Sequence, residues 1–364
     1  MQQEDPGELQ PARIVKSPLS PSAADIEEHS ATGHVQYRSW CPICVAARSV
    51  GQPHVEAPKE DETAVPRILW DYAFLGEDDG KSMPILVVKD SRTKRVASTF
   101  VQAKGSDPYA IKFGQSFLES SGYKTIVNKS DGEHSIVALK KASAQAAEVK
   151  DHSNTDSDKS EPLEAMPQEA PPGDHQANGE IEAAVREVKR QIRACKYALE
   201  ARLGTQLEDG DPVLSWLPRH AADLISRYRR GLDGKTPEQR RTGKQWRKPA
   251  IEFGEKILFR EAQAQARLST VEPVMSEGRY IGHHGRKGTL LVMTSEGVKQ
   301  GVSFRRLPAD QRFTLEGWTT LRGFPWDVRP KARSMPRPAL GDGEARQPIL
   351  EHAMAPPEGP RRFR

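Results

Sequence analysis

Two histidines and two cysteines lie close together near the start of the sequence. They stand in the stretch HSATGHVQYRSWCPIC as His29, His34, Cys41 and Cys44. Imidazole nitrogens and thiolate sulfurs are the usual ligands of structural Zn²⁺, and four of them can close a tetrahedron. A short segment that builds little core also gains much from a metal ion. The pattern predicts a zinc-binding module over residues 25–60, although a chance pair of histidines beside a reduced Cys-x-x-Cys would look the same.

Two aspartates stand at the ends of predicted strands. Asp71 lies inside the apolar run ILWDYAFL, where an uncompensated charge is costly. Asp131 follows the strand-like run TIVN. Carboxylates that meet at neighbouring strand ends can bind Mg²⁺, a cation that prefers oxygen ligands. Asp131 alone is equally typical of an ordinary turn, so Asp71 is the residue that makes the pair a candidate metal site.

One long predicted helix carries acid at its start and basic residues along its length. In HQANGEIEAAVREVKRQIR, helical spacing places Glu182, Arg186, Lys189 and Arg193 on one stripe. The glutamate could supply a third metal ligand, and the bases could contact phosphates. A solvated charged face explains the same residues if the helix is taken alone. Together with the two aspartates, the stripe predicts two divalent metals, roughly 3.5–4 Å apart, that clamp a scissile phosphate.

The elements that must position these acids follow from the pattern of apolar residues. Short runs rich in β-branched residues, separated by polar turns and followed by amphipathic segments, predict an α/β domain over residues 61–204. Within it, residues 150–173 are polar, acidic and proline-rich, which predicts a disordered insertion.

The rest of the chain divides by composition. Residues 205–250 predict a helical linker, and the four short apolar runs in residues 251–313 predict a small antiparallel β-barrel. Residues 1–24 and 314–364 are proline-rich and typical of disordered tails.

Composition and charge limit the class of protein. The 364 residues include 28 Gly, 28 Pro and 36% hydrophobic residues, which indicates compact parts joined by unstructured sequence. No run of eighteen apolar residues occurs, so no membrane partner is expected. The first residues lack the apolar core of a secretory signal, and three cysteines favour a reducing compartment. Residues 186–248 hold 16 Lys and Arg against 8 Asp and Glu, which favours a polyanionic partner.

The order of these motifs resembles that of integrases of retroviruses and LTR retrotransposons, over roughly residues 25–310. The His/Cys segment resembles the family's N-terminal zinc module, and ILWDYAFL resembles its first catalytic strand. NKSDGE is similar to the Ser-Asp-x-Gly-x-Glu segment of the second aspartate. HQANGEIEAAV is similar to the Gln-Ser-x-Gly-x-x-Glu helix start, which places the third acid at Glu182 rather than Glu180. LDGKTPEQRRTGK with EFGEKILF, and the later stretch GRYIGHHGRKGTLLVMT, are similar to the family's linker and small β-rich end.

The resemblance implies a fold, an activity and a set of partners. The expected fold is a ribonuclease H-like mixed sheet flanked by helices, between a zinc module and a C-terminal small β-barrel. The expected activity is DNA end processing and strand transfer with Mg²⁺ or Mn²⁺, in which activated water cuts near the element's end and the exposed 3′-hydroxyl then attacks target DNA. The implied partners are element ends, target DNA and further copies of the chain, and a DNA substrate implies the nucleus. The implied catalytic metal ligands are Asp71, Asp131 and Glu182. The expected DNA contacts, from the stripe as much as from the resemblance, are Arg186, Lys189 and Arg193.

Two other functions fit part of the pattern. A transposon-derived remnant that binds nucleic acid without catalysis agrees with the polar insertion and the short zinc module, whereas the presence of all three acids favours activity. A ribonuclease H that cleaves RNA–DNA hybrids would share the fold and metals, but it needs neither a zinc module nor a barrel. Cys195 has no histidine nearby in the sequence, so it is expected to face the core rather than act as a nucleophile.

Overall fold

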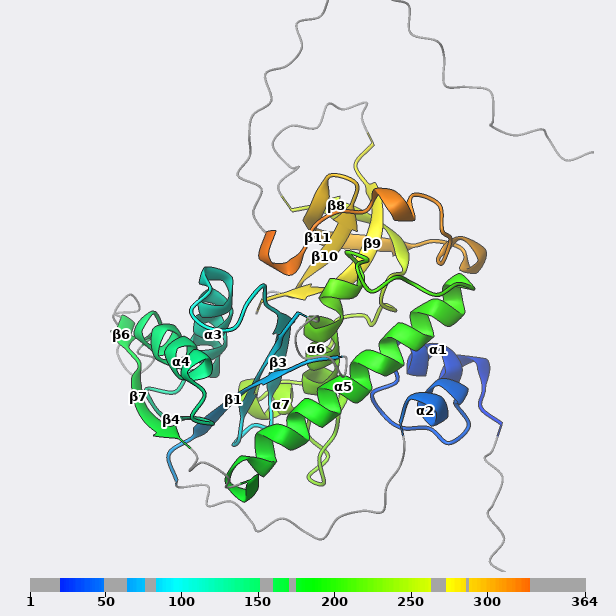
Figure 1. The fold of residues 1–364 in the computed structure, drawn as a ribbon. Coiled ribbons are helices and arrows are strands. Elements are labelled where there is room, and N and C mark those ends of the chain that lie inside the picture. Colours follow the sequence, from blue (N-terminus) through cyan, green and yellow to red (C-terminus); the bar gives the residue numbers. More distant parts are fainter. Residues whose placement is uncertain are drawn as a thin grey trace, which may run out of the picture. The chain divides into compact units, whose positions relative to one another are not determined.

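The computed structural model describes residues 20–48, 64–75, 83–150, 160–169, 175–262, 273–285 and 288–327. A mixed sheet lies at its centre (Figure 1). Its strands are β1 (Arg67–Ala73), β2 (Ile85–Asp90), β3 (Val96–Phe100), β4 (Thr125–Ser130) and β7 (Glu164–Glu169). Their order in the sheet is β3-β2-β1-β4-β7. The first three strands pair antiparallel, whereas β4 runs parallel to β1 and β7 runs parallel to β4.

The alternation of side chains along β1 divides the core into two. Ile68 and Trp70 are fully buried on one face of the sheet, in the same apolar cluster as residues of α3 (Pro108–Ser121) and α4 (His134–Gln145). Leu69 and Ala73 are buried on the other face. Because successive residues of a strand point to opposite faces, Asp71 projects on the same face as Leu69 and Ala73.

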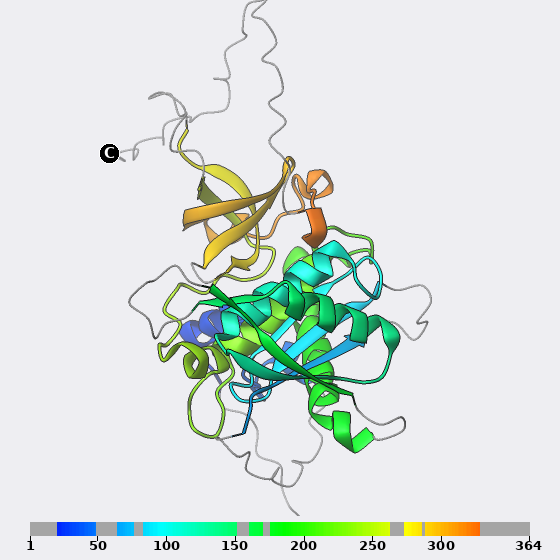
Figure 2. The same ribbon diagram turned by 90° about the vertical axis from the view of Figure 1, so that its left-hand side faces the viewer.

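Helices cover both faces of the sheet. The cluster around Leu69 includes residues of α5 (His175–Leu203) and α6 (Leu217–Tyr228), so these helices lie opposite α3 and α4. Figure 1 shows α5 as the long green helix in front of the sheet, and Figure 2 shows α3 and α4 on the other side. This confirms the predicted mixed sheet flanked by helices. None of the helices in the described ranges is long and apolar enough to cross a membrane.

The predicted disordered insertion at residues 150–173 is wrong in part. It contains β6 (Ser160–Pro162), which pairs with β5 (Glu148–Lys150), and β7, the outer strand of the central sheet. β7 pairs with β4, with Thr125 opposite Glu164. Its sequence EAMPQE has almost no buried residue, and an edge strand tolerates both proline and charge. The sequence of β7 therefore has no alternation of apolar and polar residues from which a strand could be predicted. The remainder of the predicted insertion, residues 151–159 and 170–173, lies outside the described residues.

The predicted helical linker at residues 205–250 holds a helix that packs as part of the core. It contains a 3₁₀ turn (Leu214–Trp216), α6 and the short α7 (Pro237–Thr242). Trp216, Leu217 and Ala221 are buried in the same cluster as β1, β2 and α5. The α6 helix also lies along β3, where the Ser226 hydroxyl bonds to the backbone of Val96. This segment therefore packs with α5 on one face of the sheet and is not simply a linker.

Four later strands make a closed barrel in the order β10-β11-β8-β9. They are β8 (Lys256–Glu261), β9 (Ser276–His284), β10 (Thr289–Thr294) and β11 (Gly297–Arg306). The barrel encloses its own apolar cluster, which includes Ile257, Phe259 and Val292.

The predicted tail at residues 314–364 begins with packed residues. Trp318 and Leu321 are buried in the main core, and the Trp318 indole donates to the Asp211 carboxylate at 2.6 Å. The Arg279 side chain of β9 donates to the carbonyl of Glu316 at 3.3 Å and lies over the Trp318 ring. A few large side chains therefore order residues 314–327 although the composition is typical of a tail. The predicted tails at residues 1–19 and beyond residue 327 lie outside the described residues.

Candidate metal centre and carboxylate site

Two short helices and a tight turn bring the His/Cys cluster together. His29 lies in the last turn of α1 (Ala23–Ala31), which begins with a capping box at Ser22. The chain then turns at Gly33 and His34, with φ of 65° and 58°. A left-handed conformation at a residue other than glycine costs about 1–2 kcal/mol, so His34 is held there by its surroundings. Cys41 is the N-cap of α2 (Pro42–Ala47), and Cys44 lies one turn further on.

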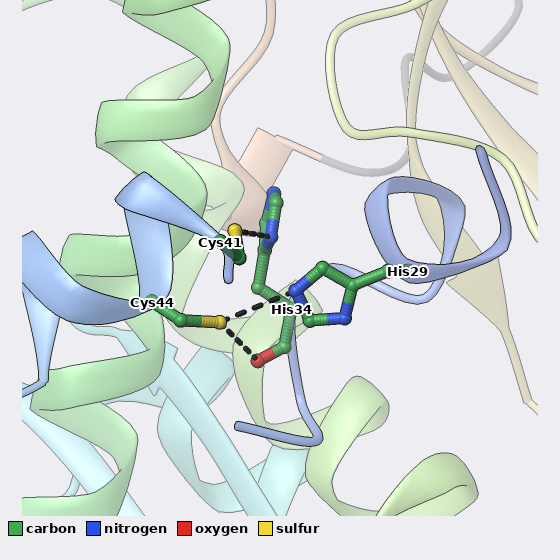
Figure 3. A group of neighbouring side chains, drawn as sticks. All are labelled: His29, His34, Cys41 and Cys44. Atoms are coloured by element: carbon green, nitrogen blue, oxygen red, sulfur yellow. Dashed lines mark hydrogen bonds between the residues drawn. The ribbon is translucent and has the colours of Figure 1, made fainter. Parts of the chain in front are cut away.

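The four ligand atoms converge inside the protein (Figure 3). All lie within 4.8 Å of one another, and all four residues are buried. The His29 Nε2 atom is 3.2 Å from the Cys44 Sγ atom, and the His34 Nδ1 atom is 3.4 Å from the Cys41 Sγ atom. Tetrahedral Zn²⁺ with normal bond lengths sets its N and S ligands roughly 3.3–3.8 Å apart. The predicted cluster is confirmed as a group that can hold a metal ion, and its donor set fits Zn²⁺.

Burial prepares the histidines for metal binding. It lowers the pKa of His29 to about 4 and that of His34 to about 3, so both imidazoles are neutral at pH 7. Neutral imidazole is the form that binds a metal. Burial also raises the pKa of the Cys44 thiol to about 11. A bound cation would supply the positive charge that this buried thiolate needs.

The cluster is fixed against the long helix α5. Arg48 donates to the Gln191 side chain, which in turn donates to the carbonyl of Gly33. Arg193 donates to the carbonyl of Ala47 at 3.3 Å. Arg193, a predicted DNA contact, thus has a structural bond to the metal module.

The pairing of β1 with β4 brings the segments that carry the two aspartates together. In the parallel pair of β1 and β4, Leu69 lies opposite Lys129. The paired residues end there: Asp71 lies two residues further along β1, and Asp131 directly follows β4. The charge of Asp131 raises the pKa of Asp71, so the two carboxylates lie near each other.

The helix α5 distinguishes the two candidate glutamates. Glu180 forms ion pairs with Arg67, Lys89 and Lys94, at 3.8, 3.1 and 3.3 Å. These bases lower its pKa against the effect of its burial. Glu180 therefore fastens α5 to the sheet. Glu182, the predicted ligand, lies one half-turn further on and is partly exposed.

Electrostatics tie the three predicted acids together. The pKa of Asp71 is raised from 3.8 to about 6, first by burial and then by the charge of Asp131. The charges of Glu182 and Glu133 raise it further. Asp71 is partly buried beside three other acids, and a bound cation would offset their repulsion. The acids nevertheless do not form a closed ligand shell. Among the described residues, only the His/Cys cluster has its ligand atoms close enough together to hold one metal ion.

Glu133 is a neighbouring acid that the sequence reasoning passed over. It precedes α4, and its carboxylate accepts bonds from Lys104 at 3.0 Å and from Ser135 at 2.5 Å. These bonds lower the pKa of Glu133 although its burial opposes them. The signal was present in the motif NKSDGE, where Glu133 stands two residues after Asp131.

The basic stripe on α5 is not uniform. Arg186 is exposed and lies 3.8 Å from the Glu182 carboxylate, one turn earlier on the helix. Lys189 is partly buried, and Arg193 bonds to the metal module. The role of these three residues in DNA binding stays a prediction. Cys195 is buried, as expected, with its pKa raised to about 11 by burial.

Comparison with known proteins gives structural similarity without sequence similarity. No protein-family model matches the chain, and no curated protein sequence matches it. A chain in the cryo-EM structure of a simian T-cell lymphotropic virus intasome with the PP2A regulatory subunit B56 gamma aligns at 10% identity and a TM-score of 0.36, over 74% of this chain and 87% of that one. The catalytic core domain of BIV integrase aligns at 16% identity and a TM-score of 0.30, over 48% of this chain and 93% of that one. With both TM-scores below 0.5, the architecture described above rests on the strand order, register and clusters of this chain itself.

Proposed function

We propose that this chain is an integrase of the retrotransposon type, with a ribonuclease H-like core that performs metal-dependent DNA end processing and strand transfer. The observation that supports the proposal is the parallel pairing of β1, which carries Asp71, with β4, which Asp131 directly follows. Residues of α5 pack in the same cluster as Leu69 and Ala73 of β1. The motif order of the sequence supports the same function.

The acids have the chemistry that the reaction needs. Asp71, Asp131 and Glu182 would hold two Mg²⁺ or Mn²⁺ ions with their carboxylate oxygens, which are the ligands these cations prefer. When bound, the ions would lower the pKa of water and stabilise charge on a scissile phosphate. The raised pKa of Asp71 supports this assignment, because a bound cation would offset the charges of the neighbouring acids.

The other parts of the chain would bind and orient DNA. Arg186 and Lys189 lie further along the helix that carries Glu182. A DNA duplex that reached the acids would therefore also contact these two basic side chains. Zn²⁺ in the His/Cys cluster would keep the N-terminal helices folded. Assembly of several copies on element ends and target DNA, in the nucleus, follows from the same proposal.

A second candidate is a nucleic-acid-binding protein without catalysis. The observation that favours it is the contact between Arg186 and Glu182, which gives the third acid a cation from the protein itself. The absence of a closed carboxylate shell among the described residues agrees with it. The two candidates share the basic surface and differ in what the acids do.

A strand-transfer assay separates them. Labelled duplexes with randomised terminal base pairs would be incubated with supercoiled plasmid and the full chain, in Mg²⁺ or in Mn²⁺. We expect joined products with either metal, and sequencing of the junctions gives the preferred DNA end. The Asp131→Asn variant should lose these products at least about 100-fold, because one metal ligand is removed.

The matched control is Asp310→Asn, which removes an exposed carboxylate in a 3₁₀ turn after the barrel. It should leave the products unchanged. If the wild type gives no product while both variants and the wild type bind DNA with the same salt dependence, the catalytic proposal fails and the second candidate holds.

A further inference from the structure

A cavity of about 150 Å³ lies away from both clusters, between α3, β3 and α6, with α7 and the β9–β10 connection also lining it. Four arginines line it: Arg95, Arg219, Arg227 and Arg241. Two acids also line it, and each is paired: Asp223 with Arg227 at 3.2 Å, and Glu238 with Arg241 at 2.5 Å. Four guanidiniums against two carboxylates leave an excess of two positive charges around a space of this size.

Ser98 lines the cavity with an unsatisfied hydroxyl. The residue is 1% exposed, and its Oγ atom has no hydrogen-bond partner. A buried hydroxyl without a partner costs about 1–3 kcal/mol, so an orphan of this kind calls for an explanation. An acceptor bound in the cavity would supply the missing partner.

The backbone of β3 directs one N–H, that of Ser98, toward the same wall. Asp90 N–H donates to the Arg95 carbonyl, so Arg95 directs its backbone toward β2 and every second residue does the same. Val96 and Ser98 therefore direct theirs outward, along the free edge of the strand. The Ser226 hydroxyl covers Val96. Ser98 is the next residue of β3 whose backbone faces the free edge, and it lines the cavity.

Arg95 is held in place at the cavity wall. Its guanidinium donates to the Ser120 hydroxyl at 2.7 Å and stacks over the Phe117 ring at 4.6 Å. Burial, and next the charge of Arg241, lower the pKa of Arg95 to about 10, so it stays protonated at pH 7. The charges of Glu238 and Asp223 offset the effects of burial and of Arg241 only in part, so an anion in the cavity would stabilise Arg95 further.

We propose that this cavity is a binding site for a tetrahedral oxyanion of the phosphate class, held by Arg95, Arg219 and the Ser98 hydroxyl. Apolar cavities of roughly 150 Å³ accommodate benzene, so a phosphate group and a few waters fit. The planar donor fork of arginine suits phosphate oxygens, and the Ser98 hydroxyl can donate a further hydrogen bond to one of them. The site is separate from the acids of β1 and β4 and does not depend on the proposed function.

The test is calorimetric titration of the full chain with inorganic phosphate at constant ionic strength. We expect saturable binding by the wild type. Ser98→Ala should weaken it about fivefold, as for the loss of one hydrogen bond, and Arg219→Gln at least about tenfold. The matched control is Ser143→Ala on α4, because the Ser143 hydroxyl is also buried and without a partner but does not line the cavity. It should bind phosphate like the wild type.

A parallel titration of a labelled duplex identifies the source of the phosphate. If Ser98→Ala and Arg219→Gln weaken duplex binding in the same proportion, the site takes a backbone phosphate of nucleic acid. If duplex binding is unchanged, it takes a soluble phosphate compound. Absence of saturable phosphate binding, or equal loss in Ser98→Ala and Ser143→Ala with normal thermal unfolding of both, would overturn the proposal.

Discussion

The His/Cys cluster and the carboxylate site differ in how completely the protein alone can assemble them. The four His/Cys ligand atoms already lie within 4.8 Å of one another. Burial keeps both histidines and the Cys44 thiol uncharged before a metal arrives, so nothing drives the ligands apart. The three acids come from β1, the end of β4 and α5, and the charges of Asp131 and Glu182 raise the pKa of Asp71. Among the described residues they do not close around a point.

The difference follows from charge. Neutral ligands can be packed like a core, whereas carboxylates repel one another and converge only when a cation offsets the repulsion. The protein stabilises the first cluster by packing. It can only bring the acids of the second near one another, on elements fixed by other contacts such as the ion pairs of Glu180.

The largest expected effect comes from removing a ligand of the preassembled cluster. Cys44→Ser should reduce the bound zinc from one equivalent to none, as measured by elemental analysis of the purified chain. It should also lower the protection of residues 23–47 in hydrogen exchange by at least about 3 kcal/mol, because metal binding there is coupled to folding. Cys195→Ser is the control, since Cys195 is buried but lies outside the cluster. Zinc retained by the Cys44 variant would show that Cys44 is not a required ligand, and absence of zinc from the wild type would show that the cluster is only a packed core.

The two neighbouring glutamates of α5 should separate catalysis from stability. Glu182→Gln should reduce strand transfer at least about 100-fold and leave the free energy of unfolding nearly unchanged. Glu180→Gln should do the reverse, lowering that free energy by about 1 kcal/mol through its lost ion pairs, with activity retained. The paired measurements are the joining assay and urea unfolding. Equal loss of activity in both variants would contradict the assignment of Glu182.

The smallest expected effect is a pH-dependent stability that Asp71 imposes on the metal-free acids. Its pKa is raised from 3.8 to about 6, so the folded state binds the proton more tightly than the unfolded state does. Its contribution to stability is complete below pH 4 and is lost as the pH rises through 6, by about 3 kcal/mol at most. Asp71→Asn should therefore be more stable than the wild type at pH 7.5, with the difference vanishing near pH 4.

Urea unfolding at both pH values, without Mg²⁺ and with zinc retained, measures this difference. Addition of Mg²⁺ should stabilise the wild type more than the Asp71 variant. A constant difference between the two proteins at all pH values would mean that Asp71 is not buried among like charges.

Sequence reasoning located the parts of the molecule whose chemistry is local. A carboxylate inside an apolar strand marked Asp71, and Cys-x-x-Cys with two histidines marked the metal cluster. The sequence could not reveal what depends on pairing over distance. β7 forms a strand because its backbone pairs with that of β4, whereas its own residues have no strand-like pattern. Arg193 was placed on a solvent stripe by helical spacing, but a neighbouring module gives it a backbone acceptor.

The cavity around Ser98 shows a similar limit. Its arginines come from positions spread between Arg95 and Arg241, so no spacing in the sequence relates them. Sequence alone gave the excess of basic residues over 186–248 and the expectation of a polyanion. The fold adds which of these bases lie together.

The two outer strands of the central sheet have a consequence for assembly. The backbone of Val96 on β3 is bonded to the Ser226 hydroxyl, at 3.0 Å to its N–H and 2.8 Å to its carbonyl. The β7 strand carries Pro167, which has no N–H to offer, between Glu164 and Glu169. Exposed strand edges are the usual templates for sheet-to-sheet aggregation, and proline, charge and a covering helix suppress it. Within the described part of the sheet, copies of this chain brought to high local concentration are therefore protected from joining strand to strand, which leaves their helices and loops to meet.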